Sequence, residues 1–131
     1  EYALSLAEEA DGRLAVLHVV DELTITEEAR AFTVQDHRRY LQEDASKRLH
    51  AAVPEEARTY CAPLEVVVAG KAYPEILRVA REHQAHLIVM GTNGRGAMGR
   101  MFLGSTTNHV IREAPCPVLT VRESQHEFVM P

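Results

Sequence analysis

The stretch from position 91 to 107 holds the residue types best suited to chemistry, because five of its first fourteen residues are glycine. Glycine lets main-chain N–H groups approach an anion without a Cβ in the way. Residues 104–106, Gly-Ser-Thr, open a predicted helix, and the first N–H groups of a helix favour negative charge. Arg95 and Arg100 add positive charge. The stretch is therefore predicted to bind phosphate.

An apolar strand predicted over His86-Leu-Ile-Val-Met90 comes directly before this stretch. In a doubly wound sheet, ligands bind beyond the carboxyl ends of the strands. A surface loop that merely tolerates glycine is the alternative on composition alone. The location after a strand favours the phosphate site.

Two common phosphate motifs fit the stretch poorly. Gly91 and Gly96 have the Walker spacing, but Ala97 stands where that motif needs lysine. Residues 94–99 match GxGxxG, yet they lack the long helix that must begin there and the acidic residue about 20 positions further on. A nicotinamide-dependent dehydrogenase is therefore disfavoured.

The elements that must position the stretch alternate along the chain. Near-continuous apolar runs predict strands covered on both faces, and apolar residues at three- and four-residue steps predict amphipathic helices. The predicted helices are 2–10, 35–52, one that starts at 73–75, and 105–113; the predicted strands are 14–20, 64–69, 86–90 and 118–121; residues 21–34 are expected to be a loop or a frayed helical turn. This order predicts an α/β fold, a doubly wound, Rossmann-like parallel sheet with helices on both faces.

Five positions within these elements carry separate expectations. Gly12 is expected to end the first helix in a left-handed conformation. Tyr40 is assigned to the apolar face of its helix, and Val110 and Ile111 to the inner side of theirs. His18 is expected to be a hydrogen-bonded core residue.

Composition and charge limit the class of protein. The 131 residues suit one domain, and 46% hydrophobic with 25% charged residues is the balance of a globular chain. A net charge of −5 disfavours nucleic acid and anionic lipid as partners. No apolar run is long enough to span a membrane and no signal segment opens the chain, so we expect the cytoplasm.

Metal and covalent chemistry find little support. Cys61 and Cys116 lack CxxC spacing and are expected to be reduced thiols. His83 and His86 have i,i+3 spacing, but one ends a helix and the other begins a strand, which disfavours a shared metal. No metal ligand and no catalytic residue is predicted.

A third template fits better than the other two. The spacing Gly91-x2-Gly94-x9-Gly104-Ser105 resembles that of the ATP-binding branch of the universal stress protein family. The resemblance covers nearly the whole chain and extends through Leu17-His-Val-Val20, Gly70-Lys-Ala-Tyr-Pro74 and Ala114-Pro-Cys-Pro-Val-Leu-Thr-Val121.

The resemblance implies a nucleotide site, residue by residue. Val19 looks like the residue whose backbone meets adenine, and Met90 like a strand-end neighbour of the ribose. The positions that look like phosphate and ribose contacts are Gly91, Thr92, Asn93, Gly94, Gly104, Ser105, Thr106 and Thr107. The implied ligand is ATP, with Mg²⁺ or Mn²⁺ as a companion ion, and the implied form is a stress-responsive homodimer joined through the C-terminal strand, 117–122.

The chain departs from the family at its start. Family members begin with a central strand that ends in a Pro-Thr-Asp-like turn, and this sequence has no such segment. Without it, backbone groups between the strands at 14–20 and 86–90 would lack partners. Either the sequence omits the N-terminal strand or another segment fills the gap. Because Glu1 already lies in a helical pattern, we expect the omission.

Three functions stay open at this point. The first is a nucleotide-binding regulatory dimer, the second a nucleotide-free adaptor domain of the same fold, and the third a weak ATP hydrolase. The glycine spacing favours the first over the second. The missing Walker lysine and the lack of an acid–base pair disfavour the third, so at most slow hydrolysis is expected.

Overall fold

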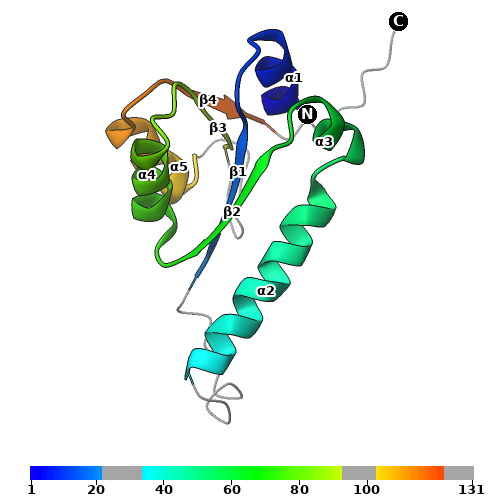
Figure 1. Ribbon diagram of the computed structural model, residues 1–131. Helices are drawn as coiled ribbons and strands as arrows, with labels where there is room; N and C mark the ends of the chain where they lie inside the picture. The colour runs from blue at the N-terminus through cyan, green and yellow to red at the C-terminus, as the bar shows by residue number, and fades with distance from the viewer. Residues whose placement is uncertain (22–33, 93–102, 123–131) are drawn as a thin grey trace, which may run out of the picture. The chain divides into compact units, whose positions relative to one another are not determined.

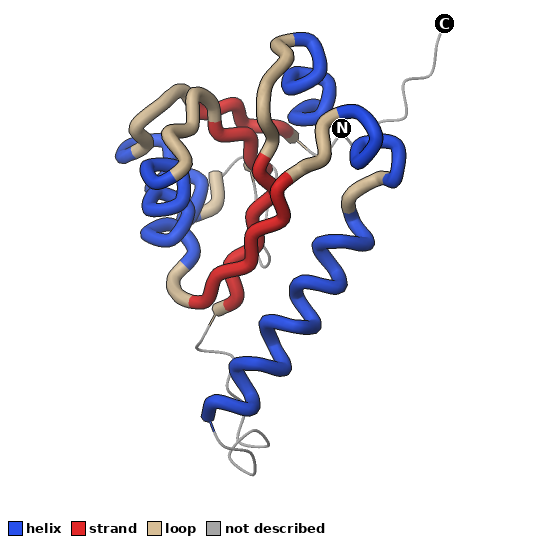
Figure 2. The backbone as a smooth tube through the Cα atoms, viewed as in Figure 1, coloured by secondary structure: helices blue, strands red, loops and turns tan. Residues whose placement is uncertain are grey.

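The computed structural model describes residues 1–21, 34–92 and 103–122. In chain order the elements are α1 (Tyr2–Glu9), β1 (Ala15–Val20), α2 (Val34–Ala52), α3 (Glu55–Tyr60), β2 (Leu64–Ala69), α4 (Ala72–Glu82), β3 (Ile88–Gly91), α5 (Ser105–Glu113) and β4 (Val118–Val121). Figures 1 and 2 show these helices and strands, and both strand pairs are parallel. The predicted α/β class with parallel strands is confirmed.

The chain divides into two compact units, residues 1–75 and 76–131. The first holds the β1–β2 pair and the second the β3–β4 pair, while α4 begins in the first and continues into the second. The expectation of a single domain over 1–131 stays a prediction.

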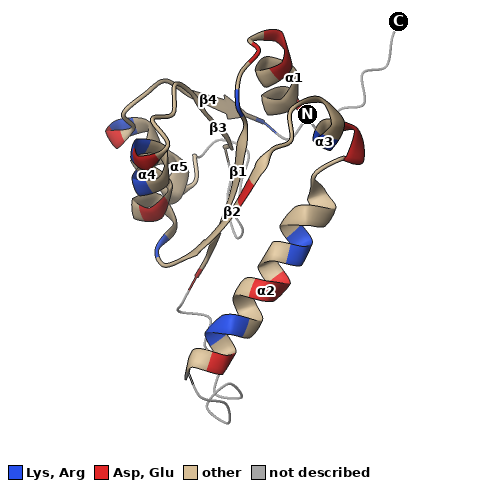
Figure 3. Cartoon of the chain, viewed as in Figure 1, with Lys and Arg blue, Asp and Glu red and all other residues tan. Residues whose placement is uncertain are grey.

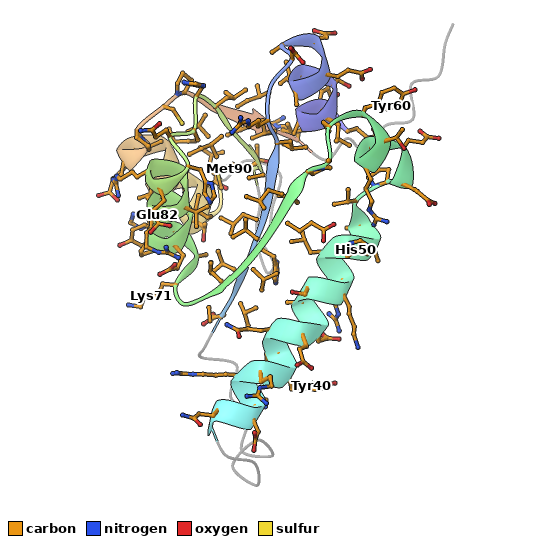
Figure 4. The ribbon with its side chains drawn as sticks, viewed as in Figure 1. Tyr40, His50, Tyr60, Lys71, Glu82 and Met90 are labelled. Atoms are coloured by element: carbon orange, nitrogen blue, oxygen red, sulfur yellow. The ribbon has the colours of Figure 1, made fainter. Side chains whose placement is uncertain are left out.

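In the first unit, β1 and β2 pair in register from Ala15 opposite Leu64 to Val20 opposite Ala69. Helix α2 packs on both strands and runs alongside them in Figure 1. Ala45 lies in this contact stripe and is 7% exposed. Tyr40, labelled in Figure 4, is 66% exposed, so its assignment to the apolar face was wrong. At 100° per residue it points about 140° away from Ala45.

Polar contacts hold the C-terminal end of α2 in place. His50 Nδ1 lies 2.9 Å from Glu65 Oε1 on β2. The Arg58 guanidinium of α3 donates to the carbonyl oxygens of His50 and Val53. The outward face of α2 carries charges of both signs, as Figure 3 shows. These contacts join α2 to α3 and to β2.

The free edge of β1 follows from its pairing pattern. In a parallel ladder, alternate residues bond to a given neighbour. Leu64 donates its N–H to the oxygen of Leu14, and Gly70 donates to that of Val20, both at 2.9 Å, so even-numbered residues face β2. The backbone groups of Val19 therefore face the other edge, which has no strand partner within the described residues. A further strand at that edge stays a prediction.

The side chains of β1 and β2 are less buried than runs covered on both faces predict. Every residue of the two strands is half-buried or exposed. His18 is exposed, so its expected place in the core was wrong. Each sheet holds two strands within the described residues. In a two-stranded sheet, each strand has a neighbouring strand on one edge and none on the other.

In the second unit, β3 and β4 pair from Ile88 opposite Val118 to Gly91 opposite Val121. Strand β3 begins two residues later than predicted, because its ladder starts where Ile88 donates to the oxygen of Pro117, at 3.0 Å. His86 and Leu87, which precede this bond, are exposed.

The inner side of α5 carries Thr107, 2% exposed, and Val110, 0% exposed. Ile111 is 42% exposed, so only half of the predicted Val110–Ile111 pair is buried. With Thr107 and Val110 both inward, Ile111 lies about 70° from the centre of the buried stripe. On α4, Leu77, Val79 and Ala80 are buried.

Helix α1 ends in a Schellman motif, the paired C-terminal bonds in which a left-handed residue follows the cap. Gly12 donates to the oxygen of Ala7 (2.8 Å) and Asp11 to that of Glu8 (3.2 Å). The left-handed residue is Asp11, with φ 50°, and not Gly12 as predicted. Aspartate tolerates this conformation, so the helix ends one residue earlier.

The described residues contain no helix of the length and hydropathy needed to cross a membrane. Helix α2, at 19 residues, is long enough but strongly polar.

Among the described residues, Gly70 is the glycine whose backbone conformation disfavours any other residue. It follows β2 with φ 145°, and an added Cβ would lie 3.0 Å from Glu75 Cγ. We predict that Gly70→Ala lowers the free energy of unfolding by about 1 to 3 kcal/mol, because an L-residue is strained at this φ. Urea denaturation would measure the change.

Gly12→Ala is the matched control for this prediction. Its added Cβ would meet Ala7 at ordinary contact distances of 3.7 and 3.8 Å. If Gly70→Ala cost no more than Gly12→Ala, the strain assigned to Gly70 would be wrong.

Candidate functional site

The carboxyl end of β3 is held by its pairing with β4. Thr92, the residue after β3, donates its N–H to the oxygen of Val121 at 3.2 Å. Met90, labelled in Figure 4, is half-buried, and Gly91 is exposed. The strand therefore delivers an exposed glycine at the edge where a parallel sheet binds ligands.

The start of α5 is bonded to the same strand end. The N–H of Gly104, the N-cap residue, donates to the oxygen of Thr92 at 2.9 Å. The hydroxyl of Thr107 donates to the oxygen of Gly91, also at 2.9 Å. One hydrogen bond thus joins residues 92 and 104, and a second joins residues 91 and 107, so both bonds link the end of β3 to the start of α5.

The first turn of α5 leaves main-chain donors open. The first bond within the helix runs from the N–H of Asn108 to the oxygen of Gly104, at 3.0 Å. The N–H groups of residues 105–107 therefore have no acceptor within the helix. The first turn of α5 has no acidic residue, whereas α2, α3 and α4 each have at least one there. The start of α5 suits an anion because its N–H groups can donate hydrogen bonds and because no carboxylate in its first turn would repel negative charge.

Gly104 has an ordinary backbone conformation, with φ −57° and ψ 153°. Any L-residue can adopt these angles, so conformation does not explain a glycine here. Close approach of a ligand to the backbone is a physical reason for one. This separates Gly104 from Gly70, whose φ of 145° itself requires glycine.

The predicted site residues fall into three groups. Asn93 and Gly94 lie outside the described residues, as do Arg95 and Arg100. Val19 belongs to the first unit, where it is half-buried in β1. The residues gathered at the β3–α5 junction are Met90, Gly91, Thr92, Gly104, Ser105, Thr106 and Thr107.

The sequence pattern missed what Thr107 does with its hydroxyl. The family resemblance grouped Thr107 with Ser105 and Thr106 as a ligand contact. Burial separates them: Ser105 is exposed, Thr106 is half-buried and Thr107 is 2% exposed. The bond from Thr107 to Gly91 spans 16 positions, and no local signal predicts it.

Other reactive side chains form no second site in the described parts of the chain. Cys61 and Cys116 are free and half-buried. No three His, Cys, Asp or Glu side chains come together as a metal site in the described residues. His83 and His86 are both exposed.

A family model for the universal stress protein family matches residues 1–122. The chain belongs to the universal stress protein family. The match spans the residues of both compact units, including β3, α5 and the glycine-rich stretch between them.

Individual relatives agree with this assignment. A universal stress protein of Methanocaldococcus jannaschii is 30% identical over 131 residues, which cover 97% of this chain and 75% of that protein. A universal stress protein of Thermus aquaticus is 51% identical over 57 residues, 44% of this chain and 42% of its own length.

Solved structures share the fold. The protein MJ0577 of Methanocaldococcus jannaschii superposes with a TM-score of 0.77 at 25% identity, covering 95% of this chain and 88% of that one. A universal stress protein family member of Arabidopsis thaliana, solved with AMP bound, has a TM-score of 0.52 at 18% identity and covers 95% and 77%. At this identity, the similarity to the Arabidopsis thaliana protein shows a shared fold and nothing further.

Proposed function

We propose that this universal stress protein binds an adenine nucleotide, ATP in the first place, and acts in the cytoplasm as a regulatory homodimer in the stress response. The observation that carries the proposal is the start of α5. There, three main-chain N–H groups without helical acceptors lie beside the hydrogen-bonded carboxyl end of β3. Such donors bind phosphate oxygens well, and they do so without any special side chain.

A family member with bound AMP and the backbone groups of Val19 favour an adenine nucleotide over free phosphate as the ligand. AMP is bound in the Arabidopsis thaliana family member, so this fold accommodates an adenine nucleotide in that protein. In this chain, the backbone groups of Val19 lie on the edge of β1 that has no strand partner within the described residues, and we propose that they contact adenine, as the family resemblance implies. Mg²⁺ or Mn²⁺ would accompany ATP, whose phosphates supply most of the oxygen ligands of such an ion.

The proposed site residues keep the roles that the family resemblance implies. Met90 and Val19 would lie near ribose and adenine. The proposed phosphate and ribose contacts are Gly91, Thr92, Asn93, Gly94, Gly104, Ser105, Thr106 and, through its main-chain N–H, Thr107. None of these residues is of a type that commonly acts as a general base, so we propose binding rather than turnover.

We predict that Gly104→Leu abolishes ATP binding while the protein stays folded. The backbone angles of Gly104 are ones that leucine can adopt, so we expect the substitution to fill the approach to the helix N–H groups without changing the backbone conformation. Isothermal titration calorimetry with ATP would measure the loss, and circular dichroism would check the fold.

Glu113→Leu is the control, because it introduces the same side chain on an exposed position at the other end of α5. ATP should bind this variant as it binds the wild type. Equal ATP affinity in Gly104→Leu and wild type would refute the site. No ATP binding by wild-type protein would instead favour the nucleotide-free adaptor.

The dimer is proposed through strand β4. Within the described residues β4 pairs with β3 alone, and an edge strand is a ready surface for pairing. Val121 accepts a bond from Thr92, so the backbone groups of Thr120 face the opposite, unpaired edge. Leu119 adds apolar surface at 39% exposure. A two-fold axis perpendicular to the strand at this edge would pair β4 of one copy with β4 of another.

We predict that Thr120→Pro converts a dimer to monomers, because proline removes the outward N–H while the bonds to β3 stay intact. Analytical ultracentrifugation would measure the mass. Thr120→Val is the control and should leave the dimer unchanged. A Thr120→Pro protein that stays folded and dimeric would place the interface elsewhere.

A further inference from the structure

Thr107 is the buried polar residue of the described core. Its side chain is 2% exposed, next to Val110 at 0%, on the inner side of α5. A hydroxyl in such a place costs free energy unless it forms a hydrogen bond. The bond it forms is the one donated to the oxygen of Gly91, at 2.9 Å.

This bond acts together with two main-chain bonds. Gly104 donates to Thr92 at 2.9 Å, and Thr92 donates to Val121 at 3.2 Å. Thr107 thus binds the last residue of β3 while Gly104 binds the residue that follows it. Two adjacent positions of the strand end are fixed against the first turn of α5, which limits both the distance and the rotation between them.

The same bond limits what Thr107 can do for a ligand. A threonine hydroxyl has one hydrogen to donate, and here Gly91 accepts it. Phosphate oxygens of a nucleotide need donors at neutral pH. The hydroxyl of Thr107 cannot serve both, and its burial keeps it from solvent, whereas Ser105 is exposed.

We infer that the hydroxyl of Thr107 is a positioning group, which fixes the end of β3 against the N–H groups of α5 and does not itself contact the nucleotide. This inference rests on the proposed function, because the site it preorganises is the nucleotide site. Preorganisation raises affinity, since less ordering remains to be done when the ligand binds.

The test compares Thr107→Val, which keeps the shape but removes the hydroxyl, with Thr107→Ser, which keeps the hydroxyl. Hydrogen exchange by NMR on nucleotide-free protein reports the protection of the Thr92 and Gly104 amides. Calorimetry with ATP reports affinity. We expect Thr107→Val to lose protection at both amides and to bind ATP about tenfold more weakly, the scale of one lost hydrogen bond. Thr107→Ser should stay within about twofold of wild type in both.

Val110→Ala is the control for general destabilisation, because it removes buried volume from the same side of α5 without touching a hydrogen bond. It should lower the melting temperature and leave ATP affinity within about twofold. Unchanged protection of Thr92 and Gly104 in Thr107→Val would overturn the inference, as would failure of Thr107→Ser to restore affinity.

The two proposals can fail separately. If wild-type protein does not bind ATP, the proposed function fails whatever the exchange data show. If wild type binds ATP and Thr107→Val loses affinity with the Thr92 and Gly104 amides still protected in the free protein, Thr107 contacts the ligand directly and the inference fails.

Discussion

The constraint on which the site depends is the set of hydrogen bonds that ties the start of α5 to the carboxyl end of β3. Thr92 is bonded on both sides, to Val121 of β4 through its N–H and to Gly104 through its oxygen. Thr107 adds a side-chain bond one residue earlier, at Gly91. Because β4 fixes β3 and β3 fixes α5, the open N–H groups of the helix have a defined location before any ligand arrives.

Much of this arrangement could be predicted from sequence, because its causes are local. Apolar runs and turn residues placed β2, β4 and α5 at the residues where the structure has them. The glycine-rich stretch was found by composition and by its position after a strand. The resemblance then named the universal stress protein family, which the family match over residues 1–122 confirms.

What could not be predicted depends on contacts between distant residues or on small angular differences. Ile111 and Val110 are neighbours in sequence, yet one is 42% exposed and the other 0%. Asp11 takes the left-handed conformation expected of Gly12, because hydrogen bonding at the helix end and not residue type alone fixes the last turn. The role of Thr107 depends on a hydrogen bond to Gly91, which lies 16 positions earlier in the sequence. Only the folded chain brings these two residues together.

The most direct measurement of the central claim is a nucleotide titration followed by two-dimensional ¹H–¹⁵N NMR. If phosphate is received by the open donors of α5, the amide signals of Ser105, Thr106 and Thr107 should show the largest saturable shifts on addition of ATP, with smaller ones on addition of adenosine. Saturable ATP binding that leaves these three signals in place, or no saturable binding at all, would contradict the account.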